Sequence, residues 1–505
     1  MNGTDTSTQA QRSRPVSEVR FVLDDAVVCV ADAPPTMTVL EYLRETVGRT
    51  GTKEGCAEGD CGACMVVLGQ LASCGTRIQY RAINACLRFL PTIDGCELLT
   101  VESLQDAAGQ LHPVQRAMVD WHASQCGFCT PGFVMSLLAL YLQRGPVLAN
   151  PVAREQVVDA VSGNLCRCTG YRPIIEAGCH VHDYPAPARW SCADAQSAAR
   201  IQRLQTLQSG SLKLPGFRAP STVNELAEAL QAQPDAQLLA GGTDVGLLVT
   251  KELRELPAMV YLGRIEELRQ VRSTANTLEI GAAVCLSDAW AAIVNLYPRL
   301  AELALRFASP PICNSGALCG NLANGSPIGD SMPILIALDA QLELRCGSQT
   351  RRLPLDQFYL GYRRTALQPG EFIAAVSVPR PQPQLRCASY KIAKRFDQDI
   401  SSVCAGIAVT VADATITSAR LAFGGMAATP ARAPTAEAVL VGHSWDEAIW
   451  SAAAAALDID FKPLSDQRAS GQYRLQVAGN LLRRFYFENT PGHACTRLDE
   501  VRVQP

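Results

Sequence analysis

Three cysteines at the spacing C-x4-C-x2-C constrain this chain more than any other feature of its sequence. This is the spacing of plant-type 2Fe-2S sites, in which one short loop brings several thiolates to an anionic cluster. Such a loop needs backbone freedom and close approach, which interspersed glycines supply. The stretch holds these residues at Cys56, Cys61, Cys64, Gly55, Gly59 and Gly62. It predicts one 2Fe-2S site, and Cys86, which follows a hairpin-like segment at 65–71, is the natural fourth ligand.

The residues around this loop predict a small domain of mixed helix and strand. Segments 19–23 and 27–30 are rich in β-branched residues and flank a tight turn. Thr38 and Glu41 form a capping box at the start of a helix. The apolar face of this helix would comprise Leu40, Leu43 and Val47. Two strands, a helix and then a cysteine loop follow the order of β-grasp ferredoxins, so we place such a domain at 19–98.

A second set of four cysteines lies in a segment of helical pattern. Its members are Cys126, Cys129, Cys166 and Cys168. After the first pair, Thr130 suits an N-cap and Pro131 the first helical position, and 133–142 is strongly apolar. After the second pair, Pro173 begins another apolar segment. The positive ends of two helices would face the thiolates, which predicts a second four-thiolate site in a helical domain at 99–183.

Composition sets the broad class of the protein. A chain of 505 residues is too long for one core. A net charge of -3 without long charged runs gives no reason to expect nucleic acid or a membrane as partner. The first twenty residues are polar, and no apolar run is long enough to cross a bilayer. We therefore expect a cytoplasmic protein, in which 20 cysteines serve as metal ligands and free thiols, not as disulfides.

Zinc is the main alternative ligand for the two cysteine sets, because structural zinc sites also take four thiolates. Zinc sites usually show two C-x2-C knuckles, and C-x4-C-x2-C is unusual among them. Iron–sulfur clusters are therefore favoured. The other twelve cysteines show no second ligand at a useful spacing and are expected to be ordinary thiols.

Two glycine-rich stretches point to a dinucleotide. In 237–246 an apolar strand runs into a glycine turn, whose N–H groups could cradle a pyrophosphate. A Gly-Gly pair after a strand is more often a simple turn, but a second stretch of small residues at 314–330 would let the backbone contact an extended dinucleotide along its length. No G-x-G-x-x-G follows a strand, so a Rossmann site is not supported.

Together, the segments 51–64, 84–87, 125–132 and 163–173 resemble the iron–sulfur part of the molybdenum hydroxylase family, and the similarity continues through the flavin stretches. The resemblance favours Cys86 over Cys74 as the fourth ligand of the first set. It implies two 2Fe-2S clusters, the second nearest a molybdenum centre and the first nearest the flavin. The implied fold is α+β multidomain, with a β-grasp ferredoxin domain and a helical 2Fe-2S domain.

The resemblance also implies the flavin part of that fold. A two-lobed FAD domain of the vanillyl-alcohol-oxidase type is expected at 213–388, after a linker at 184–212, and an α/β flavoprotein C-terminal domain at 389–505. Carried over by position, the pyrophosphate loop consists of Gln237, Leu238, Leu239, Ala240, Gly241, Gly242, Thr243 and Asp244. The remaining expected FAD contacts are Phe307 at the isoalloxazine, Ala317, Gly320, Asn321, Asp330, Ile373 and Lys391. Without the resemblance, Phe307 and Ile373 would be read as core residues and Lys391 as a solvated strand residue.

No molybdopterin-binding region is recognised up to Pro505, so we expect it on a separate large subunit, in a heterodimer or a dimer of heterodimers. The substrate site would lie there, and no catalytic residue is expected on this chain. The resemblance implies a relay from an enzyme that oxidises hypoxanthine and xanthine. A relay for an aldehyde, nicotinate or aromatic dehydrogenase is the alternative, and a zinc-binding scaffold is a more distant one.

NAD+ is the expected final acceptor. In the family a loop beside the flavin governs the approach of NAD+, and the corresponding stretch here is 394–400. Where the animal enzymes carry an acid, this chain has Gln398, flanked by Asp397 and Asp399. A missing negative charge changes the local field at the flavin, and we hypothesise a permanent dehydrogenase that does not convert to an oxidase.

Overall fold

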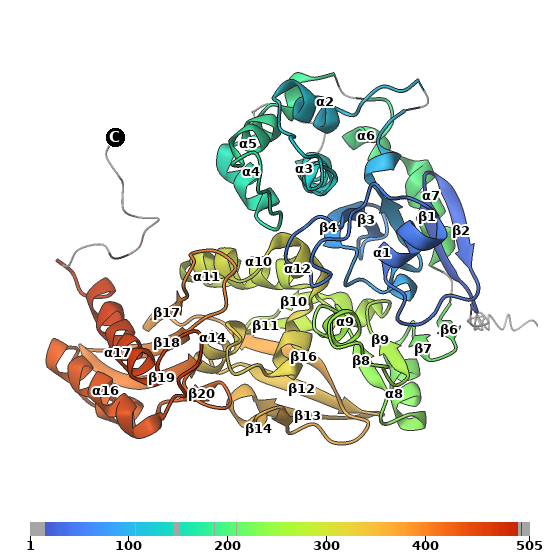
Figure 1. Ribbon diagram of the computed structural model, residues 1–505. Coiled ribbons are helices and arrows are strands. Elements are labelled where there is room, and N and C mark those ends of the chain that lie inside the picture. Colours follow the sequence, from blue (N-terminus) through green and yellow to red (C-terminus); the bar gives the residue numbers. More distant parts are fainter. Residues whose placement is uncertain are drawn as a thin grey trace, which may run out of the picture. The chain divides into compact units, whose positions relative to one another are not determined.

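The computed structural model divides the chain into two compact units (Figure 1). Unit 1 comprises Met1–Glu266 with Pro310–Ser315, and unit 2 comprises Glu267–Ser309 with Gly316–Pro505. The structure describes residues 16–106, 108–144, 152–185, 187–208, 210–492 and 496. The expected boundaries near 98 and 183 fall inside unit 1, and the expected FAD domain at 213–388 contributes residues to both units.

A five-stranded sheet forms the centre of the first part of unit 1. Its strands are β1 (Val19–Leu23), β2 (Ala26–Val30), β3 (Met65–Leu71), β4 (Ile78–Asn84) and β5 (Glu97–Leu99). Their order is β2-β1-β5-β3-β4, with β1 and β5 parallel and the other pairs antiparallel. Asp24 and Asp25 both have positive φ in the tight turn between β1 and β2. The two predicted strands and their turn are therefore confirmed.

The predicted capping box is also present, but the helix after it changes its winding. The Thr38 hydroxyl accepts from the Glu41 N–H at 3.1 Å, and the Glu41 carboxylate accepts from the Thr38 N–H at 2.7 Å. Helix α1 (Val39–Glu41) then continues as a wide π-turn, in which the Val47 N–H donates to the Tyr42 carbonyl. Because this turn holds more residues than an α-turn, Val47 leaves the apolar face and is 39% exposed. The prediction that Val47 packs with Leu40 and Leu43 is wrong.

The helical segment packs on one face of the sheet. Its helices are α2 (Pro113–Asp120), α3 (Thr130–Arg144), α4 (Arg154–Val161) and α5 (Arg172–Cys179). Helix α3 lies along β3 and β4, and α2, α4 and α5 surround it (Figure 1). Met65 and Val67 point into this core, while Val66 and Leu68 point into the core on the α1 face, as alternation along a strand requires. The core that contains Met65 and Val67 is thus shared by the sheet and helices α2 to α5.

Residues expected to form a linker instead pack against the same core. Helices α6 (Cys192–Ala195) and α7 (Ala198–Leu207) lie in this segment, and Trp190 is fully buried. The indole N–H of Trp190 donates to the Ser103 carbonyl at 2.7 Å. The segment 187–208, which we call the strap, is therefore an integral part of unit 1. Its Ser, Gln and Ala content resembles that of a linker, but its few large residues are the ones that pack.

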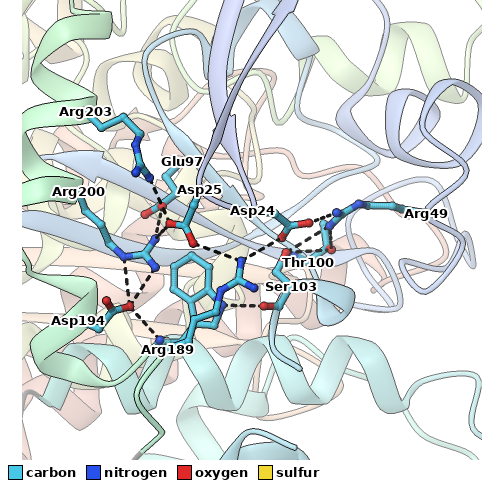
Figure 2. Close-up of polar contacts among 11 residues, drawn as sticks. Asp24, Asp25, Arg49, Glu97, Thr100, Ser103, Arg189, Asp194, Arg200 and Arg203 are labelled. Carbon is cyan, nitrogen blue, oxygen red and sulfur yellow. Dashed lines mark hydrogen bonds and ion pairs between the residues drawn. The ribbon is translucent and has the colours of Figure 1, made fainter. Parts of the chain in front are cut away.

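Arg200 of the strap lies at the centre of a charge network (Figure 2). Its guanidinium stacks 3.9 Å from the Trp190 ring centroid and donates to Glu97 at 2.7 Å. Asp25 and Asp194 approach the same guanidinium at 2.8 and 2.9 Å. Burial raises the pKa of the Glu97 carboxyl, and the Arg200 charge opposes this shift. The buried carboxylate thus has a buried cation as its partner, as a charge inside a protein requires.

A smaller sheet completes unit 1. Its strands are β6 (Leu212–Leu214), β7 (Phe217–Ala219), β8 (Gln237–Leu239) and β9 (Met259–Tyr261), in the order β6-β7-β9-β8. Its helices are α8 (Val223–Ala232) and α9 (Val245–Thr250). Helix α12 (Pro310–Ser315) also belongs to unit 1, where the Asn314 amide donates to the Ala82 carbonyl at 2.9 Å.

Unit 2 begins with a second five-stranded sheet. Its strands, in spatial order, are β10 (Val271–Ser273), β11 (Thr277–Gly281), β16 (Phe372–Pro379), β12 (Gln341–Cys346) and β13 (Gln349–Pro354). A short hairpin follows, β14 (Tyr359–Gly361) and β15 (Arg364–Thr365). The helices here are α10 (Leu286–Leu296), α11 (Ala301–Arg306), α13 (Leu318–Asn324) and α14 (Ser331–Ala337).

The last part of unit 2 is a four-stranded antiparallel sheet covered by helices. The strands are β17 (Leu385–Ile392), β18 (Val403–Ala412), β19 (Thr415–Gly424) and β20 (Ala431–Arg432). The helices are α15 (Pro434–Leu440), α16 (Glu447–Asp460) and α17 (Gly471–Glu488). Arg474 of α17 donates to the Gly425 carbonyl at 3.1 Å, which fastens α17 to the end of the sheet. None of the helices in the described ranges is both long and apolar enough to cross a membrane.

Candidate functional site

The first cysteine set comes together at one end of the β-grasp sheet. Three members lie in the loop before β3, and Cys86 lies just beyond β4. The thiols form two contacting pairs, Cys56 with Cys61 and Cys64 with Cys86. Cys74 is exposed and hydrogen bonded to Thr76, outside this group.

Backbone N–H groups surround the sulfur of Cys56. Those of Glu58 and Asp60 lie 3.4 Å from it, and that of Cys61 lies 3.3 Å away. The Cys61 thiol first, and then these N–H groups, lower the pKa of Cys56 to about 5. The pKa of Cys61 is raised, because its proton is shared with the Cys56 sulfur. A thiolate is thus stabilised in this loop, and the thiolate is the form that binds metal.

Glycines let the loop approach its own sulfurs. A side chain at Gly55 would come within 2.7 Å of the Cys61 sulfur. Gly59 and Gly62 have positive φ, of 79° and 70°. The sequence prediction that these glycines allow the loop to curl is therefore confirmed.

The second cysteine set lies at the start of helices α3 and α5. It also forms two pairs, Cys126 with Cys168 and Cys129 with Cys166. Burial, followed by the neighbouring Cys166, raises the pKa of Cys129 to about 12. Although burial acts to raise the pKa of Cys166, hydrogen bonds from Thr169 lower it. Each set thus supplies four sulfurs as two pairs, which fits a 2Fe-2S cluster with two cysteines on each iron.

Helix α3 begins one residue earlier than the sequence indicates. The Phe133 N–H donates to the Cys129 carbonyl at 3.2 Å, so Cys129 occupies the N-cap position and Thr130 is the first helical residue. The Thr130 hydroxyl instead contacts Ser124 at 2.7 Å. The prediction of Thr130 as N-cap is wrong, and the cysteine itself lies at the positive end of the helix.

No group of three His, Cys, Asp or Glu side chains in the described ranges is arranged to hold a single metal ion. The sulfurs of each set occur as two contacting pairs. That these eight cysteines bind two 2Fe-2S clusters stays a prediction.

The two cysteine loops touch directly. The Leu165 N–H donates to the Cys61 carbonyl at 3.0 Å, and the Asn164 amide donates to the Gly62 carbonyl at 3.2 Å. A side chain at Gly62 would lie 2.3 Å from the Gly163 carbonyl. Since Leu165 precedes Cys166, one hydrogen bond and short covalent segments connect a ligand of the first set with a ligand of the second.

The glycine turn of unit 1 has the predicted form of a strand followed by a turn. It follows β8, its Gly242 has a φ of 80°, and α9 begins at Val245. Gly246 packs on the Cys86 loop, because a side chain there would come within 3.0 Å of the Leu87 carbonyl. A crevice lies between the glycine turn and the Cys86 loop. It is lined by Asn84, Leu87, Arg88, Gly241, Thr243, Ile312 and Ser315. The turn thus lies against the first cysteine set.

The other residues expected at the flavin belong to unit 2. Asp330 and Lys391 form a buried ion pair at 2.7 Å. Asn321 accepts a hydrogen bond from Ser331, beside Asp330. Phe307 follows α11 and lies against Trp290, with ring centroids 5.5 Å apart. Lys391 is 4% exposed, so the solvated-strand interpretation does not hold for it.

The remaining residues of this group have simpler surroundings. Ala317 is buried at the N-cap of α13, Gly320 is exposed, and Ile373 is buried in β16 opposite Leu344. The prediction that these residues and Gln237 to Asp244 contact one FAD stays a prediction.

The loop 394–400 is held by its own residues and by α11. The Asp399 carboxylate accepts from the N–H groups of Arg395 and Ile400 at 2.9 Å. Although partial burial acts to raise the pKa of Asp399, these bonds lower it. Arg306 donates to the Phe396 carbonyl at 2.9 Å, and its guanidinium lies 4.3 Å from the Phe396 ring centroid. Gln398 has positive φ at the tip of this loop. Asp399 is thus bound within the loop, a role that the sequence did not reveal.

Four family models match the chain in succession. They are a 2Fe-2S iron–sulfur cluster binding domain at 22–88, a [2Fe-2S] binding domain at 100–179, the FAD binding domain in molybdopterin dehydrogenase at 213–381 and the CO dehydrogenase flavoprotein C-terminal domain at 388–489. The strap falls between the second and third of these matches.

The chain is also similar in sequence to known proteins of greater length. The chain is 33% identical to a xanthine dehydrogenase of Emericella nidulans, over 93% of this chain and 38% of that protein. It is 28% identical to a xanthine dehydrogenase/oxidase of Gallus gallus, over 95% of this chain and 41% of that protein. The chain therefore spans only about two fifths of the length of these relatives.

Solved structures match about half of the chain. A chain of the carbon monoxide dehydrogenase from Hydrogenophaga pseudoflava matches at 31% identity and a TM-score of 0.50, over 53% of this chain and 94% of that one. A chain of quinoline 2-oxidoreductase from Pseudomonas putida 86 matches at 25% identity and a TM-score of 0.50, over 54% and 95%. The four family models and these structures confirm the multidomain fold that is expected from the sequence.

Proposed function

Because the chain belongs to the molybdenum hydroxylase family, with that family's 2Fe-2S, FAD-binding and flavoprotein domains, we propose that it is the electron-transfer subunit of a xanthine dehydrogenase. Electrons from the oxidation of hypoxanthine or xanthine would enter the second cysteine set, pass to the first and leave through FAD to NAD+. When bound, the clusters carry single electrons and the flavin takes up two.

The direct contact between the two cysteine loops carries this proposal. The Leu165 N–H and the Cys61 carbonyl link the two sets, and the glycine turn packs on the loop of Cys86. The order in space is therefore second set, first set and turn. A relay needs this order, because each donor must lie next to its acceptor.

The residues of this chain would hold and insulate the cofactors. Backbone N–H groups aimed at Cys56 stabilise a thiolate. Cys64 and Cys86 are each 2% exposed, so water is excluded from that side of the first site. Neither feature binds an organic substrate. We therefore propose that the molybdenum centre and the substrate site belong to a large molybdopterin-binding partner subunit.

Xanthine is proposed as the substrate because the full-length relatives that match most of this chain are named xanthine dehydrogenases. The second candidate is the same relay in another molybdenum hydroxylase, which the similarity to quinoline 2-oxidoreductase favours. The identity of the large subunit that co-purifies, and the substrate that reduces the complex, distinguish the two.

NAD+ is proposed as the acceptor on the basis of the loop 394–400. Asp399 forms an ion pair with Arg395 within the loop, and Gln398 carries no charge. One of the two acids flanking Gln398 is therefore already paired, and Asp397 is exposed. The two cations of the loop, Lys394 and Arg395, balance its two acids, so the loop carries no net charge and leaves the field at the flavin to other groups. We expect no charge switch between dehydrogenase and oxidase forms.

Purification of the chain alone tests the division of labour. The isolated protein should be brown, retain FAD and oxidise NADH with an artificial acceptor, but show no turnover of xanthine. Adding the large subunit should restore purine oxidation. Molybdenum together with xanthine turnover in this chain alone would refute the proposal, and a colourless protein with bound zinc would support a zinc scaffold.

A further inference from the structure

Asn84 is a buried polar residue at the end of β4, beside the first cysteine set. It is the last residue of that strand and is 2% exposed. Both its amide oxygen and its amide nitrogen are buried, and neither has a hydrogen-bond partner in the part of the chain that the structure describes. A buried amide without a partner destabilises a fold and is rare in native proteins. Stability alone therefore does not explain why an amide occupies this position.

The backbone around Asn84 joins the two buried ligands of the first cysteine set. Its carbonyl accepts from the Leu87 N–H at 3.2 Å, which closes a turn around Cys86. The next residue, Ala85, donates its N–H to the Cys64 carbonyl at 3.3 Å. Cys64 and Cys86 are each 2% exposed. Asn84 thus lies where the chain brings two buried sulfurs together.

The side chain of Asn84 acts on the sulfur of Cys64. The Cys86 thiol is the first cause that lowers the pKa of Cys64, although burial acts to raise it, and the Asn84 side chain lowers it further. An amide N–H stabilises a thiolate, whereas an amide oxygen does not, because a thiolate only accepts hydrogen bonds. The donor of this buried amide is therefore directed toward the Cys64 sulfur. The same side chain lines the crevice beside the glycine turn, so Asn84 lies between that turn and the first set.

These surroundings fit a metal-bound thiolate at Cys64, which would be an acceptor for the buried amide donor. One-electron reduction of a 2Fe-2S site adds negative charge, and a hydrogen bond to a sulfur stabilises the more negative form. We propose that Asn84 tunes the first cluster by donating a hydrogen bond to the Cys64 sulfur, which raises the midpoint potential of that cluster. The proposal rests on the proposed function, in which the first set holds a 2Fe-2S cluster.

Asn84 is thus a positioning residue that acts through Cys64, and not a ligand. A higher potential favours the arrival of an electron at the first set from the second, which is the direction that the relay requires.

Potentiometric titration followed by paramagnetic resonance tests the proposal. The full chain with reconstituted clusters is reduced stepwise with dithionite, and the midpoint potential of each cluster is read from its own signal. Asn84→Leu keeps a similar volume but removes the donor. The equilibrium constant for one-electron reduction of the first cluster should fall roughly two- to tenfold, as expected for loss of one net hydrogen bond. For a one-electron couple this fall corresponds to a potential about 20 to 60 mV lower.

The second cluster is the internal control, and its potential should not change in Asn84→Leu. Gln143→Leu is the matched control, since the Gln143 amide also contacts β4 but donates to an oxygen, the Tyr80 carbonyl, at 3.2 Å. It should leave both potentials unchanged. An unchanged or higher potential of the first cluster in Asn84→Leu would overturn the proposal. An equal shift of both clusters, or the same shift in Gln143→Leu, would overturn it as well.

Retention of the first cluster in the variant is checked by iron content and by the intensity of its signal. If Asn84→Leu does not hold the cluster, the titration is run with Asn84→Val, whose β-branched side chain suits the end of a strand. The same fall in potential is then expected. Loss of the cluster in both variants would contradict the proposal, because it would show a role in assembly and not in tuning. A wild-type chain without any 2Fe-2S signal would refute the proposed function instead, so the two failures are distinguishable.

Discussion

The Leu165 N–H donates a hydrogen bond of 3.0 Å to the carbonyl oxygen of Cys61. Cys61 belongs to the first cysteine set, and Leu165 immediately precedes Cys166 of the second. This bond and the neighbouring Asn164–Gly62 bond fix the spacing of the two sets. The geometry on which the relay depends is therefore set by one bond between backbone groups and by one bond from the Asn164 side chain.

Gly62→Ala should separate the two sets. Gly62 has a φ of 70°, and a side chain there would lie 2.3 Å from the Gly163 carbonyl, which cannot yield as a flexible side chain would. We expect a weaker magnetic interaction between the reduced clusters in paramagnetic resonance spectra and slower transfer between them. Gly75→Ala is the control, because its φ is 67° and nothing lies within 4 Å. Equal interaction in both variants would contradict the role of this contact.

Arg200→Met should destabilise unit 1 strongly. It would leave the carboxylate of Glu97, whose side chain is 2% exposed, without its cation. Breaking a buried pair on one side costs about 3–5 kcal/mol. Arg203→Met removes a pair with Asp25 that is about one third exposed, and should cost about 1 kcal/mol or less. Urea unfolding followed by far-UV circular dichroism measures both, and similar midpoints would refute a structural role of the strap.

His112 should make unit 1 sensitive to mild acid. Burial lowers its pKa from 6.5 to about 4. A lowered pKa stabilises the fold above pH 6.5, and this contribution is lost as the pH falls toward 4, by about 3 kcal/mol in total. His112→Asn, which keeps an N-cap acceptor for α2, should flatten the pH dependence of the unfolding midpoint in this range. The exposed His122→Asn should not, and identical slopes in the two variants would contradict the prediction.

The assembled enzyme should act as a permanent dehydrogenase. Gln398 carries no charge, and Asp399 is held by its own loop, so we expect no charge-driven rearrangement beside the flavin. Steady-state xanthine turnover in air should rise strongly when NAD+ is added. Equal rates with and without NAD+, with peroxide or superoxide accounting for the electrons, would show that the enzyme is an oxidase.

The local features of this chain were predictable from sequence. Cysteine spacing, the capping box of Thr38 and the strand before the glycine turn all depend on residues close in the chain, and their patterns are visible without the fold. The π-turn after α1 was not predictable in this way. Its extra residue turns Val47 toward solvent, and the periodicity of the sequence gives no sign of it.

Contacts between distant residues account for the other differences. The partners of the strap lie far away in sequence, with Trp190 bonded to Ser103 and Arg200 to Glu97. The sequence of the strap shows its linker-like composition but not these distant partners, so it predicted a linker. Without the resemblance, Lys391 is interpreted as a solvated residue, because its partner Asp330 is 61 positions earlier. Only the fold brings such charges together.

Metal analysis combined with paramagnetic resonance tests the central claim most directly. The reconstituted chain should contain about four irons and four acid-labile sulfides, because two 2Fe-2S clusters are held by eight cysteines. After reduction it should give two distinct signals, since one set lies in a β-grasp loop and the other at two helix ends. Cys129→Ser should remove only the second signal. Zinc at near-unit occupancy, or a single class of signal in the fully reconstituted protein, would contradict the account.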